Sequence, residues 1–314
     1  MAYHLSRNLK HTLVSSLLFI GITPVAQATN YTWLGGNGNW NDANWNVSGF
    51  PNAVSSNVFI DGGNLLNSAV NLNINASVGA LNITAGDALS ILDGRSLTLN
   101  GGISTNTGTM SLNSLGLYSN VYTLLSLAGD TTLAGSGATV LTNSPYNYIA
   151  SSNATLRTLT IGNGYTVEGG GNLGINPYVN STISYLKVVN QGTVKANTSS
   201  GLSINVSDSG GTGFDNSAGQ IQVANGSSLS LDGGTISGGS IQGTGNSRLS
   251  GNGAYKDLTL QGGFKIISGN ALYTGVTFND ANTFSNGVIA RIAGTITNTG
   301  TMSLNASSTY TGFY

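Results

Sequence analysis

The sequence predicts an all-β protein, a single-stranded right-handed parallel β-helix in which short strands wind into a solenoid. Runs of alternating apolar and polar residues recur about every 10 to 15 residues, and alternation with period two is the strand signal. Asn-Gly, Gly-Gly and Ser-Gly pairs separate the runs and indicate turns. Each run is too short to bury a core alone, so the units must stack. The right-handed sense follows from the bias of parallel crossovers.

The composition agrees with an uncharged, turn-rich solenoid. The chain has 314 residues with 46 Gly, 4 Pro and no Cys, and only 7% of its residues are charged, against about 25% in ordinary globular proteins. Ser, Thr and Asn replace Lys and Glu on the expected surface. Regular apolar alternation argues against disorder, which low charge and low hydrophobicity can otherwise indicate.

The first 28 residues, 1–28, are predicted to be a secretory signal peptide. A basic start with Arg7 and Lys10 precedes an apolar run over 13–22, and an Ala-Gln-Ala cleavage site ends at Ala28. The apolar run is too short to span a bilayer as a mature helix. We therefore expect the mature chain to begin near Thr29 and to be exported.

Removal of the signal peptide changes which chemistry the chain can perform. Both histidines lie in the signal, so the mature chain has neither His nor Cys, which excludes Ser-His-Asp and Cys-His catalysis and a Cys/His zinc site. The mature chain keeps 8 of 10 basic residues and all 11 acidic ones, a formal charge of −3. This mild charge gives no support for a nucleic-acid partner. The mature sequence contains no second hydrophobic segment, so no integral membrane span is expected.

Residues 29–55 form a tryptophan-rich segment that holds all three tryptophans, Trp33, Trp40 and Trp45. A solenoid needs a cover for its first open sheet edge and its apolar end, and terminal units are usually atypical for this reason. We favour this cap interpretation. The alternative is a carbohydrate-binding platform, because tryptophan faces can stack on the apolar faces of sugars.

The tryptophan segment also carries a family resemblance. The pattern Trp33-x-Gly35, Gly38-x-Trp40, Asn44-Trp45 and Pro51 resembles the start of large secreted bacterial β-helix proteins, of the autotransporter-passenger and filamentous-adhesin type. The later segments 190–194, 214–219 and 231–235 look like the Asn-x-Gly-Thr and Gly-Gly-Thr repeats of the same proteins. The resemblance implies a bacterial cell-surface, outer-membrane or extracellular protein with an adhesive or structural role.

Residues 56–314 are predicted to form the β-helix itself. Strands are expected at 57–60, 70–74, 81–84, 89–92, 97–99, 192–196, 202–206, 220–223 and 229–231, with Val, Leu and Ile pointing inward and Asn, Ser and Thr outward. With about 20 to 25 residues per coil, the mature chain would make on the order of 12 coils.

One long repeat is superposed on the short ones. The nine residues of 105–113, TNTGTMSLN, return unchanged at 297–305. The spacing of 192 residues predicts a second long unit that begins near 294 and is truncated at Tyr314. Such surface proteins normally carry an anchor or translocator, a barrel, a membrane span or a sorting signal, and from the sequence we expect none in this chain.

Seven of the 13 tyrosines fall between 118 and 185. We expect them to stack along one side of the solenoid, where like residues align from coil to coil. A ligand-binding face is the alternative. The seven are Tyr118, Tyr122, Tyr146, Tyr148, Tyr165, Tyr178 and Tyr185.

The function predicted from these observations is a non-enzymatic, exported adhesin or structural stalk that binds host or environmental surface glycans along its faces. No cofactor is expected. The remote alternative is a polysaccharide lyase or hydrolase, because β-helix enzymes use clustered carboxylates. Here the acids are dispersed, with no Asp-Asp pair, and most sit beside Gly or Asn in turns, where Asp is favoured.

Overall fold

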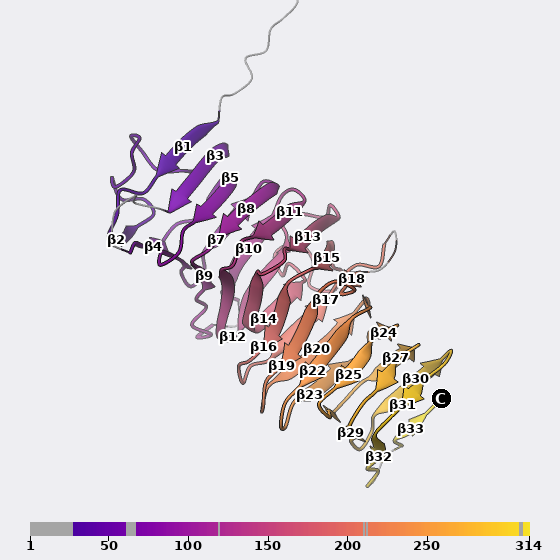
Figure 1. Cartoon of the computed structure of the whole chain (residues 1–314). Helices are drawn as coiled ribbons and strands as arrows, with labels where there is room; N and C mark the ends of the chain where they lie inside the picture. The colour runs from indigo at the N-terminus through magenta and orange to yellow at the C-terminus, as the bar shows by residue number, and fades with distance from the viewer. Residues whose placement is uncertain (1–27, 61–66, 119, 210, 212, 308–309) are drawn as a thin grey trace, which may run out of the picture.

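The computed structural model describes residues 28–60, 67–118, 120–209, 211, 213–307 and 310–314. The predicted signal peptide therefore lies outside the described residues except for Ala28. Within the described residues there are 33 strands and no helix, and every strand pairing is parallel. The strands form an elongated stack that runs from the N-terminal to the C-terminal end (Figure 1). The prediction of a parallel β-helix is confirmed, and its right-handed sense stays a prediction.

The wound sheet has three faces, each built from strands of successive coils. Face I contains, in stacking order, β2 (Asn37–Asn39), β4 (Ala69–Leu72), β6 (Ala88–Ile91), β9 (Thr109–Leu112), β12 (Ala138–Ser151), β14 (Thr166–Gly174), β16 (Thr193–Ala196), β19 (Gln220–Val223), β22 (Ser240–Gly243), β25 (Thr259–Gln261), β28 (Thr277–Phe278) and β31 (Thr297–Asn298).

Face II contains the first parts of β3 (Ala53–Ile60) and β5 (Ala76–Ile83), then β7 (Ser96–Leu99), β10 (Thr123–Leu127), the second parts of β12 and β14, β17 (Leu202–Asn205), β20 (Ser228–Gly233), β23 (Arg248–Gly251), β26 (Lys265–Ile266), β29 (Ala281–Phe284) and β32 (Thr301–Leu304).

Face III contains β1 (Thr29–Thr32), the second parts of β3 and β5, β8 (Gly102–Asn106), β11 (Thr131–Ala134), β13 (Arg157–Ile161), β15 (Leu186–Asn190), β18 (Phe214–Asp215), β21 (Thr235–Ser237), β24 (Ala254–Lys256), β27 (Asn270–Thr274), β30 (Ile289–Ala293) and β33 (Gly312–Phe313). Because β3, β5, β12 and β14 each turn a corner, all the strands connect into one sheet.

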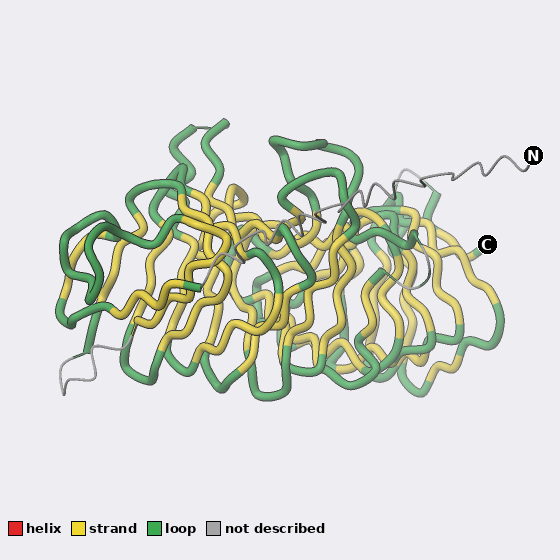
Figure 2. Tube along the Cα trace, turned by 90° about the horizontal axis from the view of Figure 1, so that it is seen from above, coloured by secondary structure: helices red, strands yellow, loops and turns green. Residues whose placement is uncertain are grey.

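Coil length varies along the stack. On face I residue 109 pairs with 138, 138 with 166, 166 with 193 and 193 with 220, so these four coils have 29, 28, 27 and 27 residues. Residues 220, 240, 259, 277 and 297 pair in the same way and give coils of 20, 19, 18 and 20 residues. We call these two regions the long coils and the short coils. Loops project from the wound strands in Figure 2.

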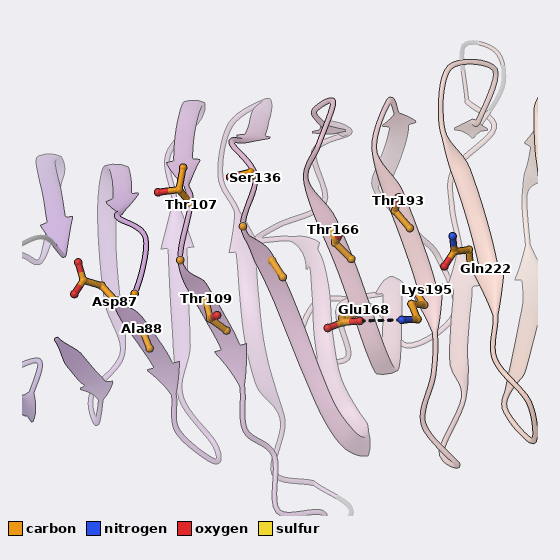
Figure 3. A pocket seen from close by; sticks show the side chains of 14 residues that line it. Asp87, Ala88, Thr107, Thr109, Ser136, Thr166, Glu168, Thr193, Lys195 and Gln222 are labelled. Carbon is orange, nitrogen blue, oxygen red and sulfur yellow. Dashed lines mark ion pairs between the residues drawn. The ribbon is translucent and has the colours of Figure 1, made fainter. Parts of the chain in front are cut away.

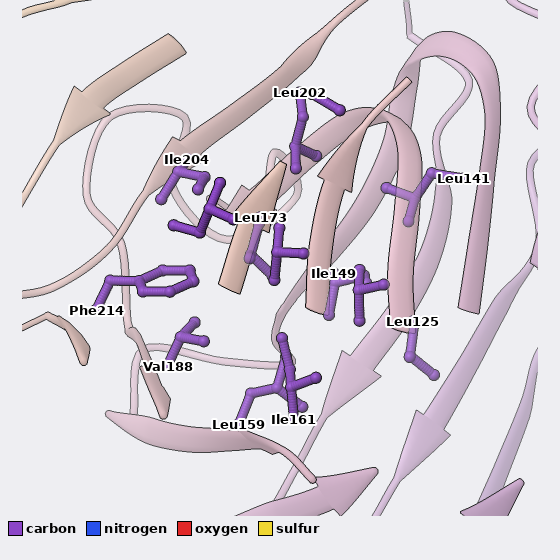
Figure 4. Packing of buried hydrophobic residues seen from close by; sticks show 14 of the residues in the cluster. Leu125, Leu141, Ile149, Leu159, Ile161, Leu173, Val188, Leu202, Ile204 and Phe214 are labelled. Atoms are coloured by element: carbon purple, nitrogen blue, oxygen red, sulfur yellow. The ribbon is translucent and has the colours of Figure 1, made fainter. Parts of the chain in front are cut away.

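The core is a set of inward-facing columns, as the alternation predicts. Most strands show alternating buried and partly exposed residues. One column on face II stacks Leu97, Leu125, Ile149, Leu173, Ile204 and Leu231 in register. Figure 4 shows four members of this column beside inward residues of the other faces. Each fully buried aliphatic side chain contributes roughly 1.5–3 kcal/mol, so the stack is stabilised rung by rung.

The two copies of the repeated nonapeptide occupy different places in the coil. In the first copy Thr105 and Asn106 are the last two residues of β8 on face III, and Thr109 begins β9 on face I. In the second copy Thr297 begins β31 on face I and Thr301 begins β32 on face II. The identical sequence is therefore shifted by one face, and the two copies are not equivalent rungs of a long structural repeat.

Candidate functional site

The three tryptophans fill the interior of the first coil. Trp33 and Trp40 are fully buried and Trp45 is 4% exposed. Trp45 lies edge-on between the other two, with ring centroids 5.1 and 5.2 Å away. Each indole N–H donates to a backbone carbonyl at 2.8–2.9 Å. Trp33 donates to the carbonyl of Gly36, Trp40 to that of Pro51, and Trp45 to that of Trp40.

This geometry favours the cap interpretation of residues 29–55. Large rings with satisfied N–H donors close the apolar end of the stack, which is what an end unit must do. Because the rings are buried against one another, they offer no exposed face on which a sugar could stack.

The carboxylates have structural tasks. Five of them accept hydrogen bonds from backbone N–H groups one coil away, and they hold neighbouring corners together. The donors and acceptors are Ser68 to Asp87, Leu115 to Asp93, Thr158 to Asp130, Thr235 to Asp208 and Gly262 to Asp280. Such charge-assisted bonds to backbone N–H groups are stronger than neutral ones.

The acids do not gather into a metal site within the described residues, where no group of three or more His, Cys, Asp or Glu side chains is placed to hold an ion. No helix of the described residues is long and apolar enough to cross a membrane. Asp61 lies outside the described residues.

A shallow groove runs along the edge of face I, across the long coils. Figure 3 shows Asp87, Thr107, Ser136, Thr166, Thr193 and Gln222 following one another along the stack. The groove has a volume of about 650 Å³. It crosses six rungs, β6, β9, β12, β14, β16 and β19. With a strand spacing of about 4.8 Å, it is roughly 24 Å long.

Glycine at the coil corners lets neighbouring coils approach closely along the groove. A Cβ on Gly108 would lie 2.3 Å from the carbonyl oxygens of Asp87 and Thr84, and one on Gly137 would lie 2.4 Å from that of Gly108. Neighbouring coils therefore approach so closely that only glycine fits. Short Thr and Ser side chains border the groove along these corners.

The groove contains a compensated pair of charges. Lys195 Nζ lies 3.8 Å from Glu168 Oε2, and Asn197 Nδ2 donates to the same carboxylate at 2.9 Å. The pair is partly exposed, so it contributes only about 0–1 kcal/mol. Glu168 and Lys195 on adjacent rungs offset each other's charge. The carboxylate of Asp87 also lines the groove, but it is buried and accepts hydrogen bonds from the backbone N–H of Ser68 and the hydroxyl of Thr84. Hydroxyl, amide and backbone groups remain to contact a ligand.

The tyrosines of the middle region are divided among three environments. Tyr122, Tyr146 and Tyr148 meet on the outside of neighbouring coils, as stacking along one side predicts. Tyr178 joins them from the loop between β14 and β15, with its ring centroid 5.1 Å from that of Tyr122. Tyr165 is buried inside the solenoid instead.

Burial raises the pKa of two of these phenols. The pKa of Tyr148 is raised to about 12, by burial first and by the neighbouring Tyr122 and Tyr146 second. Burial also raises the pKa of Tyr165, although hydrogen bonds from Thr139 and Asn106 partly oppose this effect. Tyr118 stays largely exposed, and Tyr185 is half-buried beside β15.

Comparison of the chain with protein-family models, with curated proteins and with solved structures finds no match. The architecture and the geometry of these surfaces therefore carry the functional argument alone.

Proposed function

We propose that this protein is an exported, non-enzymatic adhesive β-helix that binds an extended, neutral polysaccharide along the groove of face I. The groove itself is the observation that carries this proposal. It follows the solenoid axis over six rungs, so it suits a chain of sugar units better than a single small molecule. Its hydroxyl and amide groups match sugar hydroxyls, its exposed pair of charges is internally compensated, and its third charged side chain, Asp87, is buried.

The resemblance of 29–55 and of the later repeats to secreted bacterial surface β-helices supports the same function. The signal-like residues 1–28 support export, with display on the cell surface or release outside the cell. A mature N-terminus at Thr29, measured by mass spectrometry of outer-membrane and medium fractions, is expected. Retention of 1–28 in those fractions would contradict export.

Adhesion is tested with a groove-filling variant. In Thr166→Arg/Thr193→Arg, two long side chains occupy adjacent rungs of the groove. We expect retention on immobilised mannan, xylan or dextran to fall about tenfold or more, a loss of roughly 1.4 kcal/mol. The matched control is Thr132→Arg/Thr160→Arg, which places the same pair on adjacent rungs of face III.

Two results would overturn the proposal. Equal retention of the groove variant and the control would show that the groove does not bind the polymer. New reducing or unsaturated ends released from a bound polysaccharide would show that the protein is an enzyme.

A further inference from the structure

The loops of the long coils build a second surface, a cleft on the outside of face II. The corner before β7 contributes Arg95, the residue before β10 contributes Tyr122, and the loop between β14 and β15 contributes Asn176 and Tyr178. The cleft has a volume of about 290 Å³, close to the lower end of the ~300–1,000 Å³ range of small-molecule pockets. It is separate from the groove on face I.

Burial in β10 shows that a loop covers this part of face II. Leu125 and Leu127 point into the core, so alternation places Leu124 and Ser126 on the outside. Both are nevertheless buried, at 2% and 5% exposed. The same two residues line the cleft together with Asn176 and Tyr178. The floor of the cleft is therefore sheet, and its roof is the loop between β14 and β15.

Hydrogen bonds hold the roof in place. Asn176 Nδ2 donates to the carbonyl of Ser151 at 2.8 Å, and Asn176 Oδ1 accepts from the backbone N–H of Tyr178 at 3.1 Å. The Asn180 side chain accepts from the backbone N–H groups of Thr182 and Ile183, each at 2.9 Å. A cleft with such a roof is formed before a ligand arrives, which lowers the entropic cost of binding.

The aromatic side of the cleft is centred on Tyr122. Its ring packs edge-on against Tyr178 and Tyr148, with centroids 5.1 and 5.2 Å away. Tyr178 is 63% exposed although its backbone is held by Asn176. A tyrosine fixed by neighbouring rings, with an exposed surface and a polar hydroxyl, is suited to the alternating C–H and O–H surfaces of a sugar ring.

The charge of the cleft is positive. Arg95 is exposed and lines the cleft, and no acidic side chain lines it. The Glu168 carboxylate, which pairs with Lys195, lies on face I and so does not neutralise the charge of Arg95. The guanidinium presents a planar fork of N–H donors that matches a carboxylate. Hydroxyls of Ser96 and Thr98 lie along the same wall.

We propose that this cleft binds a carboxylate-bearing pyranose unit of an acidic glycan. The sugar ring lies against Tyr178, its carboxylate pairs with Arg95, and its hydroxyls bond to the Ser and Thr side chains of the wall. The inference rests on the adhesive function proposed above only in assigning a glycan ligand. The cleft lies on face II and binds an acidic sugar, whereas the groove lies on face I and binds a neutral polymer.

The experiment measures binding of the purified secreted chain to a panel of uronic-acid and sialic-acid oligosaccharides and to their uncharged counterparts. We expect binding to the carboxylated members, and about tenfold or more weaker binding to the uncharged ones. Arg95→Gln lowers affinity for the carboxylated sugars by about tenfold and removes the dependence on salt. Tyr178→Ala lowers affinity for both kinds.

The matched control is Tyr118→Ala, which removes an exposed tyrosine outside the cleft and leaves binding unchanged. The groove variant Thr166→Arg/Thr193→Arg also leaves cleft binding unchanged, so failure of the two proposals can be told apart. No binding to any carboxylated member, preference for the uncharged sugars, or equal affinity of Arg95→Gln and the parent chain would each overturn the inference.

Discussion

The tyrosines of the long coils and those of the short coils pack in opposite ways. On the outside of the long coils, Tyr122 meets Tyr148 and Tyr178 edge to face, at interplanar angles of 80° and 73°. Inside the short coils, Tyr255 stacks flat on Tyr273, with centroids 5.2 Å apart and an angle of 11°.

Coil length and sheet register account for the contrast. Tyr255 and Tyr273 are register partners in β24 and β27, and the corners of the short coils leave no loop that could move a ring out of its column. In the long coils the loop between β14 and β15 brings Tyr178 to its neighbours from outside the ladder. Register therefore builds core stacks, and inserted loops build surfaces that can bind.

The largest expected difference between the two groups is in stability. Tyr273→Ala removes a fully buried ring that also packs on Phe278 and Phe284, and should lower the free energy of unfolding by about 3–5 kcal/mol. Tyr178→Ala removes a largely exposed ring with one edge-on aromatic contact and should change it by about 1 kcal/mol. Denaturant unfolding followed by circular dichroism measures both. Comparable losses in the two variants would contradict the distinction.

Removal of a buried tyrosine hydroxyl should change the free energy of unfolding by a smaller amount, and with opposite sign in the two regions. Tyr165 Oη accepts from Asn106 Nδ2 at 3.0 Å and shares a hydrogen bond with Thr139 Oγ1 at 2.7 Å. Tyr165→Phe leaves both partners underpaired and should cost about 1–3 kcal/mol.

The control is the equivalent change in the short coils. The Tyr255 hydroxyl is buried with no hydrogen-bond partner among the described residues. Tyr255→Phe removes this unpaired group and should raise the free energy of unfolding by about 1 kcal/mol. The thermal midpoints of the two single variants should move in opposite directions. If both midpoints fall, the Tyr255 hydroxyl stabilises the fold and is not an unpaired group that costs stability.

Much of the fold follows from the sequence because alternation is a local signal. The expected strands at 57–60, 97–99 and 220–223 all lie within observed strands, and face I has twelve rungs where about twelve coils are expected. The same signal places aliphatic side chains inward at each rung. Turn pairs also predict where corners fall.

The surfaces do not follow from local signals, because they depend on register between residues far apart in the chain. The nonapeptide shows this most directly. Met110 and Leu112 of the first copy are buried, whereas Leu304 of the second copy is 45% exposed, although the nine residues are the same. The phase of a coil, and the presence of coils on both sides, decide burial.

The groove and the cleft have the same non-local origin. Gly108 and Gly137 become neighbours only because a 29-residue coil separates their strands, and no local pattern fixes that length. Arg95 and Tyr178 meet only because the roof loop folds back over face II, through the side chain of Asn176. The tyrosine-rich composition of 118–185 is the one sequence signal that points to this region.

A last expected effect concerns alkaline pH. The pKa of Tyr148 is about 12 in the folded chain, against 10.0 for an unperturbed tyrosine, mainly because of burial. The folded state thus keeps a proton that the unfolded state has already lost. This contribution to stability is complete below pH 10 and is lost as the pH rises from 10 to about 12.

Tyr148→Phe should therefore reduce the fall in unfolding free energy across this pH window. Its near-ultraviolet absorbance should also lack one late tyrosinate step. The remaining decline is expected from Tyr165 and from the stacked pair of the short coils, because burial raises the pKa of Tyr165, Tyr255 and Tyr273. A Tyr148→Phe chain that loses stability as steeply as the parent between pH 10 and 12 would show that the outer tyrosines titrate without coupling to the fold. The buried tyrosines Tyr165, Tyr255 and Tyr273 would then carry the alkaline response.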